Sequence, residues 1–83
     1  MQFKLNARTV NPNDNEEIYH YVGEDGSTVK FQAGKQAFTY LFYKSSTAPK
    51  KVQSKLVDAF INQGFKQHDY AGGFYEAIAT LTV

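Results

Sequence analysis

The sequence contains no cysteine and no tryptophan, and only two of its 83 residues are proline. Without cysteine the chain has no disulfide framework and no thiol nucleophile, so packing or association has to supply its stability. Residues 1–5 lack the apolar core of a signal peptide, and no apolar run approaches the ~20 residues that cross a bilayer. These absences predict a soluble cytoplasmic protein that has no membrane partner.

Aromatic side chains are abundant instead: the chain has seven Phe and six Tyr. Its content of 42% hydrophobic and 20% charged residues is typical of a folded chain rather than a disordered one. A chain this short buries only about 60–65% of its unfolded surface, and large rings are an efficient way to bury area. We therefore expect a single domain over residues 1–83, without internal repeats.

The net charge of +1 conceals an uneven distribution of charge along the chain. Residues 1–26 carry two basic and five acidic side chains, residues 27–66 carry seven Lys and one Asp, and residues 67–83 carry two acidic side chains. These segments have net charges of −3, +6 and −2 in turn. The basic middle would steer an anionic partner if it stayed together in space. Folding can also intermix the charges, and we favour that second interpretation.

Two patterns in the first half of the chain predict β-structure. Apolar and polar residues alternate over 2–10, which is typical of a half-buried strand and places Ala7 on the same face as Phe3. Further on, the β-rich segments 18–22 and 28–32 flank an Asp-Gly pair, which is a hairpin signal.

A stronger strand pattern follows over residues 37–44. Aromatic residues occupy both of its faces, and a strand that is apolar on both faces is covered on both sides. We take its rings as a candidate aromatic contact face: Phe38, Tyr40, Phe42 and Tyr43.

Apolar residues at helical spacing predict a helix over residues 48–63. Thr47 is expected as its N-cap, and Gly64 is expected to end it in the left-handed conformation. The inner stripe of this helix consists of Val52, Leu56, Ala59 and Phe60.

The end of the chain is predicted to form one further strand over residues 74–83, after a turn at Gly72-Gly73 and a possible short strand at 65–70. Alternation over 74–83 places Ala77, Ala79 and Leu81 on one face. The two alanines leave room for a helix close above that face.

The predicted order of elements is β-ββ-β-α-β. This order is typical of an α+β two-layer sandwich, in which a mostly antiparallel sheet of four to five strands packs on one helix. One helix covers only one face of such a sheet. Curling of the sheet, a ligand or a second copy of the chain has to cover the other face, and we favour a homodimer.

The start of the predicted helix has an unusual charge. A first turn carries free N–H groups and partial positive charge and favours Asp or Glu, yet this one carries two lysines. Hydroxyls, lysines and free N–H groups together predict a site for an anion or an anionic partner. The alternative is an ordinary cap with solvated lysines. The candidate residues are Ser46, Thr47, Lys50, Lys51 and Lys55.

The other candidate chemistry is weaker. His68-Asp69 offers half of an acid–base pair, but no nucleophile is tied to it by spacing. Asn11–Val22 fails the calcium-loop pattern, because Glu16 stands where Gly is required and Val22 where Glu is required. His20 lies within a predicted strand. We expect no enzyme activity, no cofactor and no metal.

Met1–Leu5 resembles the start of the immunoglobulin-binding domain of protein G. That domain has two strands before its helix and more are expected here, so its function is not carried over. The favoured function is a small non-enzymatic protein-binding or regulatory module, inhibitor-like, whose partner is another protein or a second copy. The alternative is a nucleic-acid-binding module that combines sheet aromatics with the basic 44–66 segment. Its lysines would be Lys44, Lys50, Lys51, Lys55 and Lys66.

Overall fold

A computed structural model describes residues 1–13, 16–33, 41–66 and 74–83. Its strands are β1 (Gln2–Val10), β2 (Glu17–Gly23), β3 (Thr28–Ala33), β4 (Leu41–Ser46) and β5 (Thr80–Thr82). Its helical elements are α2 (Lys50–Ile61), a π-helical turn (Asn62–Lys66) and the short α3 (Phe74–Ala77). Of the predicted strand at 37–44, residues 37–40 lie outside the described residues, and β4 continues to Ser46. The predicted Gly72-Gly73 turn also lies outside them.

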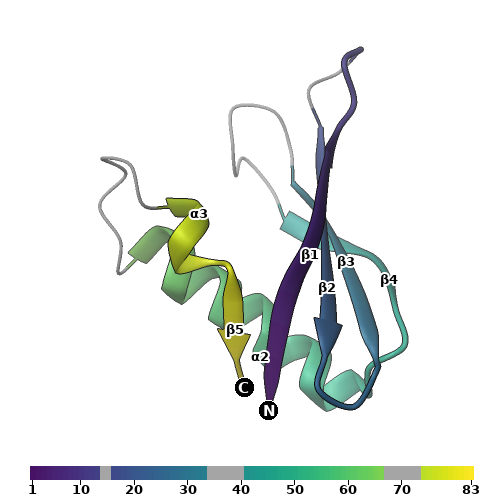
Figure 1. Ribbon diagram of the computed structural model, residues 1–83, viewed down its shortest axis with the longest axis vertical. Coiled ribbons are helices and arrows are strands. Elements are labelled where there is room, and N and C mark those ends of the chain that lie inside the picture. Colours follow the sequence, from purple (N-terminus) through teal and green to yellow (C-terminus); the bar gives the residue numbers. More distant parts are fainter. Residues whose placement is uncertain (14–15, 34–40, 67–73) are drawn as a thin grey trace.

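The five strands form one sheet in the order β4-β3-β2-β1-β5, and every neighbouring pair is antiparallel. Figure 1 shows α2 lying along one side of this sheet, while the N- and C-terminal ends meet where β1 pairs with β5. The predicted fold class, an α+β two-layer sandwich, is confirmed. None of the described helices is long and apolar enough to cross a membrane.

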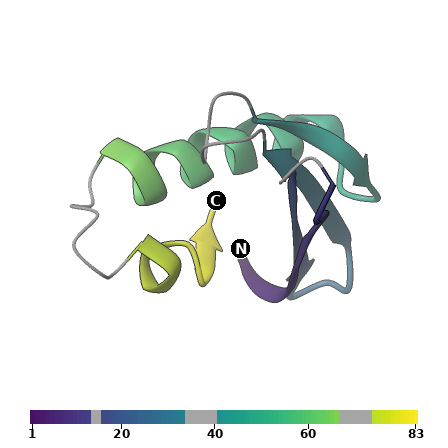
Figure 2. The same ribbon diagram turned by 90° about the horizontal axis from the view of Figure 1, so that it is seen from above.

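The sheet curves toward α2 rather than lying flat beneath it. The backbone of α2 comes closest to the two edge strands, β4 and β5, so the central strands lie farther from the helix. The view from above shows this curvature (Figure 2). Large side chains therefore have to fill the space between α2 and the central strands.

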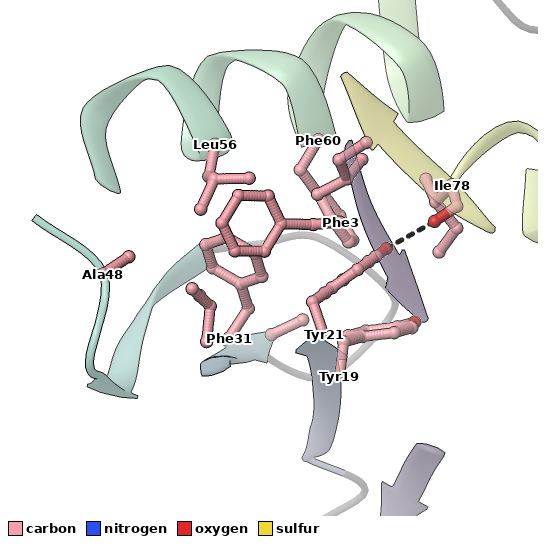
Figure 3. Close-up of a cluster of buried hydrophobic side chains, with 11 residues drawn as sticks. Phe3, Tyr19, Tyr21, Phe31, Ala48, Leu56, Phe60 and Ile78 are labelled. Atoms are coloured by element: carbon pink, nitrogen blue, oxygen red, sulfur yellow. Dashed lines mark hydrogen bonds between the residues drawn. The ribbon is translucent and has the colours of Figure 1, made fainter. Parts of the chain in front are cut away.

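Aromatic rings fill that space, with Phe60 of α2 at their centre (Figure 3). The ring centroid of Phe60 lies 5.3 Å from that of Tyr19, 5.6 Å from that of Phe31 and 6.4 Å from that of Tyr21. Two of these pairs meet edge to face, a favourable arrangement for aromatic rings. Leu56 is fully buried beside Phe60, which confirms the predicted inner stripe of the helix.

A β-bulge in β1 overturns the predicted position of Ala7. Leu5 pairs with Tyr21 but Ala7 pairs with His20, so Asn6 is an extra residue in β1. An extra residue moves every later side chain to the opposite face. Ala7 is therefore exposed on the face away from α2, and the prediction that it shares the face of Phe3 is wrong.

The hairpin between β2 and β3 forms as predicted, with Asp25 as its organising side chain. The Asp25 carboxylate accepts hydrogen bonds from the Ser27 hydroxyl at 2.6 Å and the Ser27 N–H at 2.9 Å. Because these bonds favour the ionised form, they hold the pKa of Asp25 below its usual value. Gly26 has a φ of 85°, which other residues rarely adopt.

Both predicted helix boundaries are wrong. Pro49 occupies the N-cap position, where its ring offers no hydrogen bond, while the Thr47 hydroxyl accepts the Thr28 N–H of β3. At the other end, Gly64 is buried within the π-helical turn and does not adopt the left-handed conformation. That turn also occupies 65–66, at the start of the possible strand at 65–70.

The predicted strand over residues 74–83 is wrong for its first half. Residues 74–77 form α3, and only Thr80–Thr82 pairs with β1. Ile78, which alternation placed opposite Leu81, is buried together with it. Three hydrogen bonds of the Gln63 side chain, to backbone groups of Ala77, Thr80 and Thr82, hold this segment in place.

A buried hydrogen bond also ties this segment to the middle of the sheet. The Tyr21 hydroxyl donates to the carbonyl oxygen of Ile78 at 2.6 Å (Figure 3). Burial, reinforced by the neighbouring Tyr19, raises the pKa of Tyr21 far above its usual value. Tyr21 therefore stays protonated in the folded protein where an unfolded chain would lose the proton.

Substituting Leu56→Ala is expected to lower the free energy of unfolding by about 2–5 kcal/mol, because a fully buried side chain leaves a cavity. Urea denaturation measures the change. The matched control is Lys55→Ala on the exposed side of α2, for which we expect a change within about 0.5 kcal/mol. Equal effects of the two substitutions would contradict the observed orientation of the helix.

Substituting Tyr21→Phe is expected to lower the free energy of unfolding by about 1–3 kcal/mol at neutral pH, because the buried Ile78 carbonyl loses its donor. The stability that depends on protonated Tyr21 is fully present below about pH 10 and is lost as the pH rises above it. Denaturation midpoints measured from neutral to alkaline pH should therefore fall less steeply for Tyr21→Phe. If the denaturation midpoints of the unmodified protein and of Tyr21→Phe fell equally steeply at alkaline pH, the pH dependence would belong to another group.

Candidate protein-binding face

The sheet face turned away from α2 is the candidate site, and we call it the outer sheet face. Residues on it alternate with the core residues along each strand, as the strand registers show. In Figures 1 and 2, α2 lies on the opposite side of the sheet. The strands bring together Lys4, Ala7 and Thr9 from β1, Ile18, His20 and Val22 from β2, Lys30 and Gln32 from β3, and Thr80 from β5.

Two lysines carry positive charge on this face, Lys30 in its middle and Lys4 toward its hairpin end. Lys4 pairs with Val22, and Lys30 pairs with His20, so the two cations lie diagonally on either side of β2. Both are exposed, and neither forms an ion pair with any residue that the structure describes.

Two carboxylates that the structure describes on this side of the sheet lie at the ends of β2 and are already engaged in hydrogen bonds. Glu24, just beyond β2, accepts a hydrogen bond from the Gln2 N–H. Glu16, just before β2, accepts one from the Gln32 side-chain amide. Lys30 therefore lies in the middle of the outer sheet face, Lys4 lies toward the hairpin end where Glu24 also stands, and hydrogen-bonded carboxylates flank both ends of β2.

The outer sheet face has a hollow at each end. One aliphatic side chain from β2 lines each hollow. A hollow of about 490 Å³ at the hairpin end is lined by Val22, together with Gln2, Lys4, Leu5, Asn6, Gly23 and Glu24. A hollow of about 240 Å³ at the other end is lined by Ile18, together with Thr9, Val10, Asn11, Glu16 and Gln32. Val22 is 37% exposed and Ile18 is half-buried, so both side chains are accessible to a partner.

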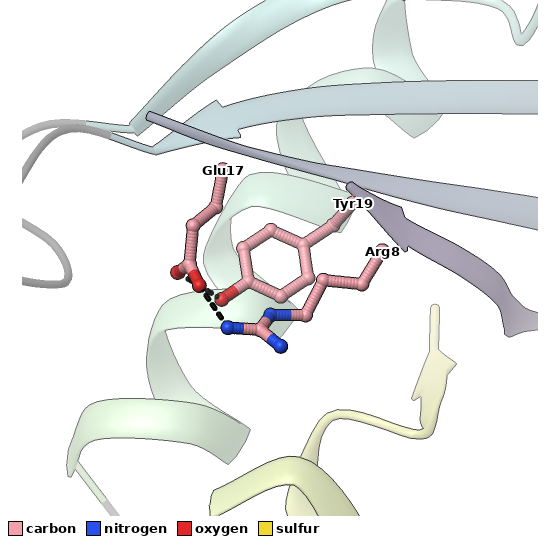
Figure 4. A network of polar contacts seen from close by, with 3 residues as sticks. All are labelled: Arg8, Glu17 and Tyr19. Carbon is pink, nitrogen blue, oxygen red and sulfur yellow. Dashed lines mark hydrogen bonds and ion pairs between the residues drawn. The ribbon is translucent and has the colours of Figure 1, made fainter. Parts of the chain in front are cut away.

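The only arginine of the chain lies on the other face of the sheet. Because the bulge reverses β1, Arg8 stands opposite the buried Tyr19. There Arg8 forms an ion pair with Glu17, and the Glu17 carboxylate also accepts a hydrogen bond of 2.8 Å from the Tyr19 hydroxyl (Figure 4). This network satisfies polar groups at the end of the core and adds no charge to the outer sheet face.

The aromatic side chains that the structure describes are all buried on the α2 side of the sheet. They are Phe3, Tyr19, Tyr21, Phe31 and Phe60. Of the predicted aromatic contact face, Phe38 and Tyr40 lie outside the described residues. Phe42 and Tyr43 lie in β4, where their backbones pair with Gln32 and Phe31. That predicted contact face stays a prediction.

The hydroxyl residues of the predicted anion site are engaged within the protein. Thr47 donates its N–H to the Thr28 carbonyl at 2.9 Å and accepts the Thr28 N–H on its hydroxyl at 2.8 Å. The Ser46 hydroxyl accepts the Ala48 N–H at 3.0 Å. The lysines Lys50, Lys51 and Lys55 are exposed on α2, whose first turn contains no acidic residue. Anion binding at this end of the helix stays a prediction.

Folding brings basic and acidic segments together at this end of the molecule. The two hydrogen bonds between Thr28 and Thr47 hold the start of α2 beside the β2–β3 hairpin. The hairpin carries Glu24 and Asp25, and the first turn of α2 carries lysines. The acidic and basic segments of the sequence are therefore not separated in space here.

The histidines give no catalytic arrangement in the described part of the chain. His20 is half-buried on the outer sheet face, between Ala7 and Lys30. His68-Asp69 lies outside the described residues. Within residues 1–13, 16–33, 41–66 and 74–83, no group of three His, Cys, Asp or Glu side chains is placed to hold a metal ion.

No protein-family model, curated protein or solved structure matches the chain. The function is therefore inferred from the outer sheet face itself. Sequence reasoning did not select Lys4, Lys30, Ile18 and Val22 as site residues. The alternation in β2 and β3 was the available signal, but it does not show which strands are neighbours or which face α2 covers.

Substituting Lys50→Glu together with Lys51→Glu is expected to raise the free energy of unfolding by about 0.3–1 kcal/mol for each residue, because acidic side chains favour the first turn of a helix. Thermal denaturation measures this gain. Lys55→Glu, one turn further along α2, is the control and should have a smaller effect. NMR amide shifts at residues 50–53 on addition of phosphate would support the anion site if the unmodified protein shows them and the double variant does not. If the unmodified protein shows no such shifts, the lysines are only solvated and bind no anion.

Proposed function

We propose that the protein is a small non-enzymatic protein-binding module that holds its partner on the outer sheet face. The observation that carries this proposal is the one-sided core. Side chains of α2 and of the C-terminal segment pack on one face of the sheet, while half-buried Ile18 and exposed Val22 lie on the other. A partner that covers these two aliphatic side chains removes apolar surface from water, which is favourable.

The shape of the face supports a protein rather than a small molecule as partner. The sheet curves toward α2, so the outer sheet face is convex across the strands (Figure 2). Small-molecule sites are concave and enclose most of the ligand surface. A convex face with a hollow at each end suits a broad partner surface that places one side chain in each hollow.

A nucleic-acid-binding module is the second candidate, and the exposed lysines of α2 favour it. Base stacking needs accessible rings, and the five rings buried in the core cannot serve it: Phe3, Tyr19, Tyr21, Phe31 and Phe60. Arg8 is held by Glu17, which leaves lysines as the phosphate contacts. These observations favour protein binding. A regulatory or inhibitor-like role in the cytoplasm stays part of the proposal.

Site-specific photo-crosslinking in cells of the source organism tests the proposal. A photoreactive residue in place of Thr9, exposed on the outer sheet face, is expected to yield a discrete protein adduct. The same residue in place of Ser54, exposed on α2, is the matched control and should yield none. The further substitution Ile18→Asp should remove the adduct, because it places a charge in the apolar part of the interface.

The identity of the adduct separates the candidates. An adduct of twice the mass of the chain, together with self-association in sedimentation at micromolar concentration, would identify a second copy as the partner. A nuclease-sensitive adduct would support the nucleic-acid candidate. An adduct from position 54 alone, or one that Ile18→Asp leaves unchanged, would contradict binding through the outer sheet face.

A further inference from the structure

We infer that the partner presents an acidic protein surface with apolar side chains to the outer sheet face, an inference that rests on the proposed function. The face carries Lys30 in its middle and Lys4 toward the hairpin end, and the β2 residues paired with them, His20 and Val22, carry no carboxylate. Among the described residues neither lysine has an ion-pair partner. Complementary charge on a partner would supply the missing counter-charges.

The border of the face reinforces this charge pattern. Glu16 and Glu24 stand at opposite ends of β2, and each accepts a hydrogen bond within the sheet. These hydrogen bonds hold both carboxylates at the border of the face, away from its middle. A partner with its carboxylates between Lys4 and Lys30 meets both lysines and lies away from Glu16.

The same pattern disfavours a second copy packed face to face. A two-fold axis through the middle of an interface brings each central residue close to its own copy. Lys30 and His20 of one chain would then meet Lys30 and His20 of the other, without a carboxylate from the middle of either face. Like charges placed opposite one another across an interface are unfavourable.

The apolar side chains distinguish an acidic protein from a nucleic acid. Val22 and Ile18 line the two hollows, where they offer contacts to apolar side chains. A phosphate backbone carries no apolar side chains for these hollows. An acidic segment that also carries residues such as Leu matches both the lysines and the hollows.

Titration of the isotope-labelled full chain with a short synthetic peptide of Glu and Leu tests the inference by NMR. Amide shifts are expected along β1, β2 and β3, and they should weaken as salt rises. Lys4→Glu with Lys30→Glu should weaken binding about tenfold. Lys51→Glu with Lys55→Glu on α2 makes the same change in net charge and should leave the affinity within about twofold.

Two further ligands and a neutral variant complete the test. A peptide with Lys in place of each Glu should not bind, and a single-stranded oligonucleotide should shift the face less than the acidic peptide does. Lys4→Gln with Lys30→Gln should weaken binding less than the Glu pair, and circular dichroism of each variant checks that the chain still folds.

Shifts confined to α2, equal binding of the two peptides, or stronger binding of the oligonucleotide to the face would each overturn the inference. The proposed function is judged separately by crosslinking from Thr9. A protein adduct there whose contact region is neutral or basic would keep the protein-binding face and reject the acidic partner.

Discussion

The packing of Phe60 against the rings of Tyr19, Tyr21 and Phe31 is the interaction on which the rest of the structure depends. A short chain without disulfides has few ways to bury enough area, and large rings packed between one helix and a sheet bury it efficiently. Because these rings are large, the central strands stand off from α2 while the edge strands approach it. The curvature of the sheet follows from this arrangement.

The aromatic core also determines how the end of the chain is held. The Tyr21 ring lies among the core rings, and its hydroxyl reaches the Ile78 carbonyl. Gln63 adds hydrogen bonds from the π-helical turn to backbone groups of residues 77–82. A short strand therefore completes the sheet, and side chains from distant parts of the sequence secure it.

A core on one side of the sheet also explains the proposed site. The described rings and the Arg8–Glu17 pair lie on the face toward α2, while the opposite face carries His20, Gln32 and other polar side chains beside the aliphatic ones and the two lysines. Its curvature makes it convex, and its register places Lys4 and Lys30 on either side of β2. Shape and charge together favour a protein partner of opposite charge.

The sequence by itself determined the elements whose signals are local. Helical spacing identified Leu56 and Phe60, and the Asp25-Gly26 pair identified the hairpin, because each signal lies within a few residues. The antiparallel α+β class and the alternation of the outer sheet face followed from the same local patterns. Only the pairing and register of the strands determined which side chains share that face.

The tertiary structure decided the features that depend on contacts between distant residues. The bulge at Asn6 appears only when β1 is matched to β2, since alternation in one strand carries no register. Thr47 fits an N-cap by local rules, but β3 offers its hydroxyl a different partner. Residues 74–79 alternate like a strand, yet burial of Ile78 and its bond to Tyr21 favour another path, because long-range packing outweighs weak local preference.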